Sequence, residues 1–432
     1  MKRPLFCFAL PPRSPAVLVR LACRVLPVVL FAAASARAAQ TFDWPRWRGP
    51  ELNGHSRETG WTTQWPKEGP PILWRAEVGI GFSSITVGGG RAFTLGNRND
   101  KDTVYAFDAA TGREIWKFTY DEPTDPHYYE GGTSCTPTLD GDALYTLSRR
   151  GELCRFEAAT GRVIWRTNLA RATGAKVPEW GFASAPLVEG DWLILNAGSA
   201  GTAIDKRDGK VVWTSGKGSA GYSSAVPFVF EGERHVVMAA LESIIAVRVK
   251  DGARLWEYPW KTRYDVNAAD PILAGDKVFI SSAYDHGGAL LRVRGREVTK
   301  VWENKNLRNH INTSVLVAGH LYGIDGDAGA KDSALRCVAL DSGEVKWTEK
   351  AVGSGALMVA DGKLIILSAT GELIVAEPSP EAFKPIARAQ VIGGKCWTVP
   401  VLAHGRIYCR NAQGRVVCVD VRDPHGAIPS AH

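Results

Sequence analysis

The chain has 432 residues, of which 45% are hydrophobic and 22% charged, a composition typical of a globular protein with a sizeable core. Its formal net charge is +7, but positions 1–38 hold six Lys or Arg residues and no acidic residue. The remainder therefore carries a formal charge of 7 − 6 = +1. A nearly neutral chain gives no electrostatic reason to expect nucleic acid as a partner.

The first 38 residues have the organisation of a secretory signal peptide. A basic segment precedes an apolar run from Val25 to Ala34, which leads into Ala36-Arg37-Ala38. A positive segment, a short apolar segment and a small-residue cleavage motif in this order are typical of export signals. Because the apolar run is too short to span a bilayer, we predict a cleaved signal over residues 1–38, no transmembrane segment, and a periplasmic or secreted protein.

Six cysteines follow the predicted signal, at spacings that indicate neither a zinc site nor a disulfide framework. An even number of cysteines in an exported chain permits disulfides, yet no pair has C-x-x-C spacing. We expect mostly buried thiols, with Cys409–Cys418 as the one pairing to consider.

A repeated motif dominates the rest of the sequence. Segments such as AFDAATGREIW, RFEAATGRVIW and AIDKRDGKVVW share the pattern Asp-x-x-Thr-Gly-x-x-x-Trp or a decayed form of it. Successive motif tryptophans lie 42 to 49 residues apart, which suits one four-stranded propeller blade per repeat. These tryptophans are Trp74, Trp116, Trp165, Trp213, Trp256, Trp302 and Trp347.

Each repeat predicts four short antiparallel strands, termed a to d from first to last. Residues 133–166 read TSCTPTL, DGD, ALYTLS, RRG, ELCRFE, AATGR and VIWR, so β-branched and aromatic runs alternate with Gly/Asp turns. No stretch after the predicted signal shows a sustained helical period of apolar residues. The predicted fold class is therefore all-β.

The repeats predict eight blades. Eight a–b–c units begin near Phe82, Thr133, Phe182, Tyr222, Ala268, Ile311, Gly353 and Cys396. The seventh d strand is weak, around Pro385-Ile386-Ala387, and none follows the eighth unit. The unpaired d strand is the one that contains Trp74, so we expect the N-terminal strand to complete the last blade and close the ring, which removes open sheet edges. The predicted organisation is an N-terminal extension over 39–70, an eight-bladed propeller over 71–423 and a tail over 424–432.

The motif tryptophans have a structural explanation. An indole at a fixed place on every d strand is expected to pack against the next blade, with its N–H bonded to a backbone carbonyl. The Thr-Gly-Arg and Asp-Gly-Lys turns before them are typical of hairpins rather than of phosphate-binding loops. We expect a propeller of this kind to be monomeric.

These repeats resemble the pyrroloquinoline-quinone-type repeats of the quinoprotein alcohol dehydrogenase-like superfamily. The opening DWPRWRGPELNGHS followed by WPKEGPPILW is similar to the start of small exported members. The resemblance covers about Asp43 to Asp423 and implies the propeller fold, but no single function. The superfamily includes quinone-dependent dehydrogenases and also non-catalytic scaffolds, such as the propeller lipoprotein of outer-membrane protein assembly. Pyrroloquinoline quinone with calcium is the cofactor that the resemblance raises.

Ligand-binding residues are expected on one face of the ring. The a–b and c–d turns are short and repetitive, whereas the d–a and b–c connections on the opposite face, the long-loop face, are irregular, as binding loops on a rigid scaffold commonly are. They hold the candidate residues Glu179, Trp180, Tyr222, Tyr264, Asp265, Asn267, Asn309, His310, Asn312, Lys395 and Trp397. These residues form either a polar ligand site around the channel or an ordinary solvated loop face.

The sequence supports no catalytic or metal-binding assignment. Asp325-Gly-Asp327 with Asp332 departs from the spacing of a calcium loop, and no G-x-S-x-G motif is present. The resembling dehydrogenases typically place a disulfide of adjacent cysteines over the cofactor, and no cysteines are adjacent here.

We therefore expect an exported, non-catalytic propeller that binds a protein, peptide or glycan on its long-loop face. The alternative is a small quinone-dependent alcohol or sugar dehydrogenase, because the loops hold acid, amide and aromatic residues. A third hypothesis is a hydrolase with carboxylate pairs across the channel, which the carboxyl separations test.

Overall fold

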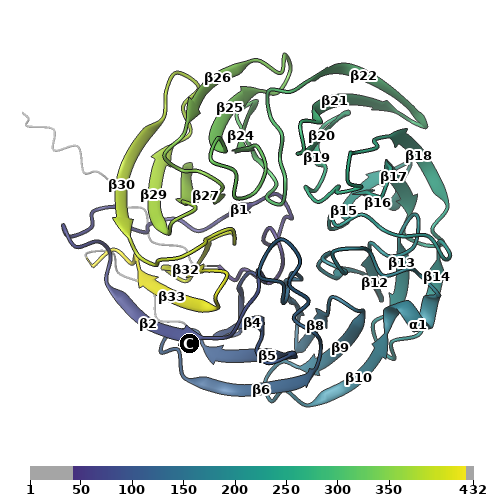
Figure 1. The fold of residues 1–432 in the computed structure, drawn as a ribbon, viewed down its shortest axis with the longest axis horizontal. Coiled ribbons are helices and arrows are strands. Elements are labelled where there is room, and N and C mark those ends of the chain that lie inside the picture. Colours follow the sequence, from purple (N-terminus) through teal and green to yellow (C-terminus); the bar gives the residue numbers. More distant parts are fainter. Residues whose placement is uncertain (1–41, 425–432) are drawn as a thin grey trace, which may run out of the picture. The chain divides into compact units, whose positions relative to one another are not determined.

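The computed structural model describes residues 42–424 and arranges them as an eight-bladed β-propeller (Figure 1). The predicted signal peptide and the predicted tail from residue 425 onward lie outside the described residues. The blades are four-stranded antiparallel sheets, one of them with an added fifth strand, which confirms the predicted fold class. No helix within residues 42–424 is long and apolar enough to cross a membrane.

The first four blades follow one another along the chain, each with its strands in sequence order. Blade one consists of β3 (Thr86–Gly88), β4 (Arg91–Asn97), β5 (Lys101–Asp108) and β6 (Glu114–Asp121). Blade two consists of β7 (Thr138–Asp140), β8 (Ala143–Leu147), β9 (Glu152–Glu157) and β10 (Val163–Asn168). Blade three consists of β11 (Leu187–Glu189), β12 (Trp192–Leu195), β13 (Thr202–Asp205) and β14 (Val211–Thr214). Blade four consists of β15 (Val226–Phe230), β16 (Glu233–Ala239), β17 (Ser243–Arg248) and β18 (Arg254–Pro259).

The remaining blades have the same design, and the eighth takes its outer strand from the N-terminal part of the chain. Blade five consists of β19 (Ile272–Ala274), β20 (Lys277–Ser282), β21 (Gly287–Arg294) and β22 (Glu297–Asn304). Blade six consists of β23 (Val315–Val317), β24 (His320–Asp325), β25 (Ala334–Ala339) and β26 (Val345–Glu349). Blade seven consists of β27 (Ala356–Ala360), β28 (Lys363–Leu367), β29 (Glu372–Glu377) and β30 (Lys384–Gln390). Blade eight consists of β31 (Val401–Ala403), β32 (Arg406–Arg410), β33 (Arg415–Asp420) and β2 (Ile72–Glu77).

The ring closes as the unpaired Trp74 strand predicts. β2 pairs antiparallel with β33, with Trp74 opposite Cys418 and Ala76 opposite Val416. The first and last strands of the ring therefore share one sheet, and the N-terminal strand confirms the predicted closure. The weak seventh d strand is also present, as β30.

Two short elements are not predicted from the sequence. β1 (His55–Ser56) adds a parallel fifth strand beside β27 in blade seven. α1 (Leu169–Thr173) connects blades two and three; the Asn168 side chain caps its start and Gly174, with φ of 72°, follows its end. Both elements are too short to leave a period in the sequence.

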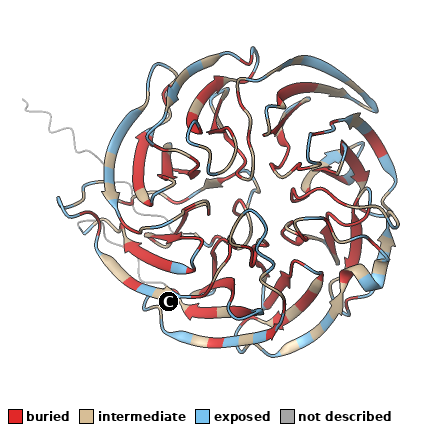
Figure 2. Cartoon of the chain, in the orientation of Figure 1, coloured by how far each residue is buried: buried red, intermediate tan, exposed pale blue. Residues whose placement is uncertain are grey.

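The hydrophobic core lies between neighbouring blades. The inner strands are almost entirely buried, whereas the outer d strands alternate between packed and exposed positions (Figure 2). One cluster, for example, joins Phe93 and Leu95 of blade one to Leu144 and Phe156 of blade two. Each repeat thus buries its faces against its neighbours, as stacked repeats must.

The motif tryptophans contact the c–d turn of the next blade. Six indole N–H groups donate to carbonyls there: Trp74 to Ala109, Trp116 to Ala158, Trp165 to Lys206, Trp213 to Val249, Trp302 to Leu340 and Trp347 to Ser379. The turn glycine lies against the indole, since a Cβ added to Gly112 would stand 2.6 Å from Trp74. The motif therefore couples Gly and Trp because the glycine of one repeat leaves room for the tryptophan of the repeat before.

Trp256 departs from this arrangement, because its Nε1 has no hydrogen-bond partner within residues 42–424. The next blade, blade five, turns from β21 to β22 in a tight hairpin with Arg294 opposite Glu297. This hairpin replaces the longer turn that presents the acceptor carbonyl elsewhere. The sequence shows the change, since the copy that ends at Trp302 has lost the motif glycine.

All six cysteines of the described chain are buried free thiols. The Cys409–Cys418 disulfide that the sequence suggests as the one pairing to consider is therefore not formed. The register explains why: Cys418 is opposite Tyr408, whereas Cys409 is opposite Val417. Side chains alternate between the two faces of a strand. The two thiols therefore lie on opposite faces of the same sheet.

A belt of hydrogen bonds links the segments just before consecutive a strands. Its members are Ser84 N–H to Thr136 Oγ1, Ala185 N–H to Ser224 Oγ, Ser224 N–H to Asp270 Oδ1 and Asp270 N–H to Thr313 Oγ1, at 2.7 to 3.1 Å. Because side chains of one blade satisfy backbone groups of the next, the belt fixes the segments at the channel in place.

Candidate ligand-binding site

An N-terminal segment, residues 43–61, lies across one end of the axial channel; we call it the strap. Trp44 bridges to Val87 of blade one, and β1 pairs with β27 of blade seven. Glu58 accepts the backbone N–H of His404 in the a–b turn of blade eight at 2.8 Å. The strap therefore contacts blades around the ring at the end that carries the a–b turns.

A buried polar cluster anchors the strap to blade five. Trp47 Nε1 donates to Asp270 Oδ2 at 2.7 Å, and Ser224 N–H donates to Oδ1 at 2.7 Å. Arg48 Nε lies 3.9 Å from the same carboxylate, and the Arg48 guanidinium also donates to the carbonyl of Thr313. Burial raises the pKa of Asp270 and lowers that of Arg48, while their mutual attraction opposes both shifts. Each charge is therefore compensated by the other.

A pocket of about 320 Å³ opens on the long-loop face and extends along the channel to the strap. Trp47 of the strap and Asp270 of blade five contribute to its wall. Most of the remaining lining comes from the connections between blades and is rich in rings: Phe82, His127, Tyr128, Tyr129, Trp180, Tyr222, Tyr284, His310 and Trp397. Among the described residues that line it, none is a lysine or an arginine.

Trp180 is the centre of an aromatic cluster in this pocket. Its ring centroid lies 5.1 Å from that of His127, 6.1 Å from that of Tyr128 and 6.0 Å from that of Tyr129, all with inclined planes. Tyr222 Oη accepts the backbone N–H of Trp180 at 3.4 Å. Because the rings around Trp180 are inclined and not stacked on one another, some of their faces remain available to a ligand.

Phe82 and Trp397 form a second aromatic unit. Their rings are stacked, with centroids 5.4 Å apart and planes at 23°. Lys395 Nζ lies 4.5 Å from the Trp397 ring and 2.8 Å from a carboxylate oxygen of Glu130. In the same way, Arg149 lies over the Tyr129 ring and pairs with the carboxylate of Asp125. The cations near the pocket are thus already held by rings and carboxylates.

His310 and Asn312 supply polar atoms to the lining. His310 Nδ1 accepts the backbone N–H of Ala328 at 2.8 Å, so the proton of the neutral imidazole is on Nε2. Burial lowers the pKa of His310 to about 4, which keeps the ring neutral at neutral pH. Asn312 uses its amide N–H groups on the carbonyls of Gly355 and Trp397, which leaves its amide oxygen as the remaining acceptor.

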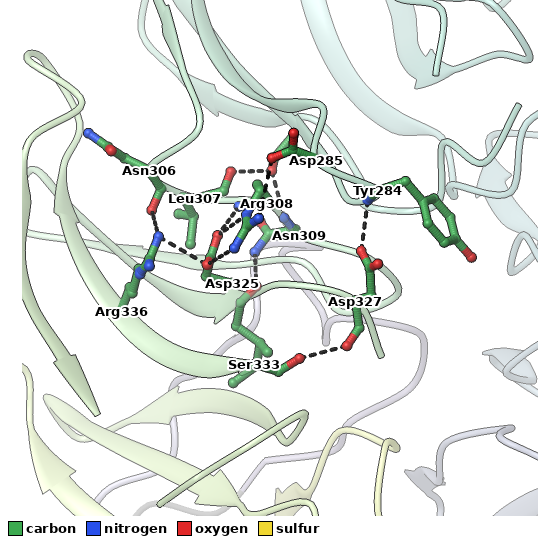
Figure 3. A network of polar contacts seen from close by, with 12 residues as sticks. Tyr284, Asp285, Asn306, Leu307, Arg308, Asn309, Asp325, Asp327, Ser333 and Arg336 are labelled. Atoms are coloured by element: carbon green, nitrogen blue, oxygen red, sulfur yellow. Dashed lines mark hydrogen bonds and ion pairs between the residues drawn. The ribbon is translucent and has the colours of Figure 1, made fainter. Parts of the chain in front are cut away.

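A charged hollow of about 270 Å³ adjoins the pocket at blades five and six. Beside it, the Asp325–Asp327 loop takes part in a network of polar contacts (Figure 3). Asp325 is fully buried, and both its oxygens are held by Arg308 at 2.8 to 3.0 Å, with Arg336 at 3.0 Å from Oδ2. Asp327 accepts the backbone N–H of Tyr284 at 2.7 Å. These carboxylates stabilise a loop and are not arranged as a cation site.

The structure brings together five of the predicted ligand-binding residues, which all line the pocket: Trp180, Tyr222, His310, Asn312 and Trp397. Tyr264 lines the adjoining hollow instead. Glu179 is exposed and Asp265 half-buried, each next in sequence to a pocket residue, and Lys395 packs on Trp397.

Asn267 and Asn309 are buried, and their amides are used inside the fold. Asn267 donates to three backbone carbonyls, including that of Trp260, and accepts from Ser282. Asn309 bonds to the carbonyl of Ile324 and to the hydroxyl of Ser314. Neither residue lines the pocket, so their amides order the loops that carry the other candidates.

Sequence reasoning missed the parts of the pocket that come from distant segments. Trp47 lies in the predicted extension, and Asp270 in the Ala-Ala-Asp-Pro run before β19. Neither has a local motif. The one available signal for Trp47 is the density of tryptophans at 44–47, ahead of the first repeat.

The residues of the channel do not fit a quinone with calcium. A quinone that carries carboxylates requires cations, and the described lining holds no lysine or arginine. Asp270, the one carboxylate in the lining, already accepts from Trp47 and Ser224. Among residues 42–424, no group of three or more His, Cys, Asp or Glu is placed to hold a metal ion. Calcium takes six to eight oxygen ligands.

The hydrolase hypothesis also lacks its chemical groups in this pocket. A glycosidase pair requires two carboxylates that face the scissile bond. Asp270 is the single carboxylate in the described lining, and it is engaged with the strap.

Comparisons with known proteins agree with this architecture. The comparison with curated sequences gives no match. Among solved structures, BamB from Moraxella catarrhalis is similar over 81% of this chain and 99% of its own, with 16% identity and a TM-score of 0.58. Quinohemoprotein alcohol dehydrogenase from Comamonas testosteroni is similar over 90% and 82%, with 14% identity and a TM-score of 0.63. A europium-containing methanol dehydrogenase is similar over 87% and 89%, with 13% identity and a TM-score of 0.63. Identities this low show the fold alone.

A family assignment comes from the sequence profile of the repeats. The profile described as outer membrane protein assembly factor BamB matches residues 52–135 and 100–349, which together exceed half of the chain. The matched part runs from the strap into blade six. The chain therefore belongs to this BamB-like family of propellers built from quinoprotein-type repeats.

Proposed function

We propose that this chain is an exported, non-catalytic binding protein that holds a protein or peptide partner on its long-loop face. The observation that carries the proposal is the aromatic pocket at the mouth of the channel. Its inclined rings around Trp180 offer contact area, its lining holds no paired carboxylates, and the strap closes the channel behind it. Aromatic side chains in this setting are typical of recognition surfaces.

A protein or peptide is favoured over a glycan by the family. The matching profile is described as an assembly factor, and assembly factors act on other proteins. The pocket volume of about 320 Å³ suits one or two side chains rather than a whole domain. We therefore place the pocket at the centre of a wider interface formed by the d–a and b–c loops.

The test is selection of a random heptapeptide phage library on the purified chain, with counter-selection on Trp180→Leu. We expect peptides whose affinity falls at least about tenfold in Trp180→Leu, the usual cost of losing an anchor at an interface. Trp65→Leu is the matched control, because Trp65 is half-buried and outside the pocket. Failure to recover any peptide that depends on Trp180 would contradict the proposal, and a saccharide on a parallel glycan array that depends on Trp180 would move the function to glycans.

The dehydrogenase alternative has its own measurement. The purified chain is incubated with pyrroloquinoline quinone and calcium, desalted, and examined for quinone absorbance and dye-linked alcohol oxidation. We expect neither, because the pocket offers no cation to the quinone carboxylates. Stoichiometric retention of the quinone would overturn the non-catalytic assignment.

A further inference from the structure

Two carboxylates that have no ion pair within the described residues are next in sequence to residues of the aromatic pocket. Glu179 precedes Trp180, and Asp265 precedes the lining residue Val266. Within residues 42–424 neither carboxylate has an ion pair or a hydrogen bond to its side chain. Both negative charges affect the Tyr222 hydroxyl: burial is the main cause that raises its pKa to about 12, and the charges of Glu179 and Asp265 raise it further. Tyr222 lines the pocket and its Oη accepts the backbone N–H of Trp180, so the two acids act beside the ring at the centre of the aromatic cluster.

The positive charges nearby are held by other groups and do not line the pocket. Arg149 lies 3.3 Å from Asp125, and Lys395 lies 2.8 Å from Glu130, so each of these cations has its own acid. On the loop of Asp265, Lys261 is paired with Glu242, and Arg263 stands 5.1 Å from the Tyr264 ring centroid. Arg149 and Lys395 stand over rings of the pocket, 5.6 Å from the Tyr129 centroid and 4.5 Å from the Trp397 centroid. The rings of this site thus already take part in cation–π contacts.

We propose that the pocket binds an organic cation, the head of a lysine or arginine side chain of the partner or an equivalent quaternary ammonium, against Trp180 and Tyr129. This inference rests on the proposed binding function and names the chemistry that the pocket selects. The aromatic faces supply the cation–π attraction, and Glu179 and Asp265 supply the long-range field.

The other polar groups of the pocket are compatible with a cation. His310 is neutral at neutral pH, so it adds no positive charge to the lining. Its Nε2–H and the Nε1–H of Trp180, which is buried without a partner in the described chain, are donors for an acceptor group that accompanies the cation, such as a backbone carbonyl or a hydroxyl. The amide N–H groups of Asn312 are bonded to carbonyls, so its oxygen is the atom of this side chain that an N–H donor of a ligand can contact. An anion would meet two carboxylates without an ion pair and, among the described lining residues, no lysine or arginine. Phosphate or carboxylate ligands are therefore disfavoured.

The first experiment compares charge at constant shape. Choline and its uncharged isostere, in which carbon replaces the quaternary nitrogen, are titrated separately into the purified chain by calorimetry. We expect choline to bind about tenfold more tightly or better, as a cation–π contact in a partly desolvated site predicts. Equal affinity of the two probes would overturn the proposal, because the pocket would then recognise apolar surface alone. Absence of choline binding would overturn it if the peptide pair below shows no preference either.

A second pair of probes distinguishes the source of the cation. A pentapeptide with a central arginine is compared with the same peptide carrying citrulline, which has a similar shape and no charge. Preference for arginine supports a side chain of a protein partner, and preference confined to choline supports a free small cation. Lack of preference in both pairs overturns the proposal.

Variants locate the effect within the pocket. Trp180→Leu is expected to abolish the preference for the charged probe, and Glu179→Gln combined with Asp265→Asn to reduce it about threefold to tenfold. Glu231→Gln is the matched control, because Glu231 is exposed in the turn between β15 and β16 on the opposite face. Urea unfolding of each variant verifies that it is folded. An unchanged preference in the double variant, with the fold intact, would contradict the role of the two acids.

The two proposals fail in different ways. Library peptides that depend on Trp180 but bind equally well without basic residues would leave the binding function in place and overturn the cation. If no peptide and neither cation binds, both proposals are wrong.

Discussion

The two ends of the axial channel differ in how their polar groups are satisfied. At the strap end, Asp270, Arg48 and Glu58 are buried, and each is bonded to groups on a different segment of the chain. At the long-loop end, Glu179 is exposed without a partner within the described residues, and Tyr128 is 93% exposed. One end of the same ring is therefore closed by internal contacts, and the other keeps its recognition groups free.

Stability and binding therefore depend on different ends of the molecule. Buried charges that depend on one another make a segment costly to disturb. Exposed rings and acids contribute little to folding and remain available to a ligand. The belt of hydrogen bonds around Ser224 and Asp270 joins the two ends, so the strap holds the scaffold on which the loops stand.

Asp270→Ala, which removes the anchor of the strap, is expected to lower the free energy of unfolding more than any other variant proposed here. The substitution leaves the Arg48 guanidinium buried without its carboxylate and removes the acceptor of Trp47 Nε1 and Ser224 N–H. Breaking a buried pair by removing one partner costs about 3–5 kcal/mol. We expect the free energy of unfolding in urea to fall by that amount.

Asp265→Asn at the other end is the control for this prediction, because Asp265 has no ion pair within residues 42–424 and asparagine tolerates its φ of 54°. It is expected to change the unfolding free energy by less than about 0.5 kcal/mol. Similar losses in the two variants would remove the contrast between the two ends.

The second prediction concerns Asp102, a buried carboxylate beside the b–c turn of blade one. Burial raises its pKa to about 7; one oxygen accepts from Asn97 at 2.7 Å, and the other has no partner in the described chain. The folded state thus favours the protonated acid, so this contribution to stability is present below about pH 4 and is lost as the pH rises through 7. We expect Asp102→Asn to be more stable than the wild type at pH 8, by on the order of 3 kcal/mol, and nearly equal at pH 4.

Unfolding by urea between pH 4 and pH 8 tests this sign. A wild-type and variant difference that does not depend on pH would show that Asp102 is not protonated in the fold. A difference that grows from pH 4 to pH 8 would instead show that Asp102 destabilises the fold when it is ionised. A destabilising buried group near the long-loop end is expected where the structure is not optimised for stability.

The third prediction separates packing from backbone conformation in the c–d turns. Gly112 has φ of 71°, and a Cβ there would stand 2.6 Å from the Trp74 ring. Gly232, in the a–b turn of blade four, has a similar φ of 77° and no atom within 4 Å of an added Cβ, so it has the positive φ without the neighbour. We expect Gly112→Ala to cost about 1 kcal/mol more than Gly232→Ala in thermal or urea unfolding, since overpacking adds to the strain of a positive φ. Equal costs would mean that the motif glycine serves the turn alone.

The blades and their closure could be predicted from the sequence because they depend on a repeated local chemistry. The Gly–Trp coupling occurs again and again, and the unpaired Trp74 strand leaves one arrangement that closes the ring. The decayed copies are informative too, since the copy before Trp302 that lacks the motif glycine belongs to the blade next to Trp256, whose Nε1 has no acceptor within residues 42–424.

The pocket could be predicted only in part. Trp180, His310 and Trp397 lie on irregular connections, and irregularity in a regular repeat indicates a site. Asn267 is on a similar connection yet is buried, because its amide satisfies three carbonyls that no sequence pattern reveals. The strap was unpredictable for the same reason: the contact of Trp47 with Asp270 joins residues 223 positions apart.

Replacing Tyr128 is expected to change the free energy of unfolding very little but to weaken binding of the charged probes. Tyr128 is 93% exposed and has φ of 61°, a conformation that favours glycine, while its ring lies 4.3 Å from that of His127. Tyr128→Gly relieves the strain but increases the freedom of the unfolded chain, so we expect the unfolding free energy to stay within about 0.5 kcal/mol of the wild type. Affinity for the charged probes is expected to fall about twofold to fivefold, because one aromatic face beside Trp180 is lost.

Val229→Ala is the control at the other end of the ring, because Val229 is 59% exposed and belongs to β15, beside the turn into β16. It should leave both stability and affinity unchanged. A ring that is exposed, conformationally strained and dispensable for folding has no structural reason to be aromatic. If Tyr128→Gly left affinity intact, the aromatic cluster would have to be narrowed to Trp180 and Tyr129, the two rings on which the cation proposal depends.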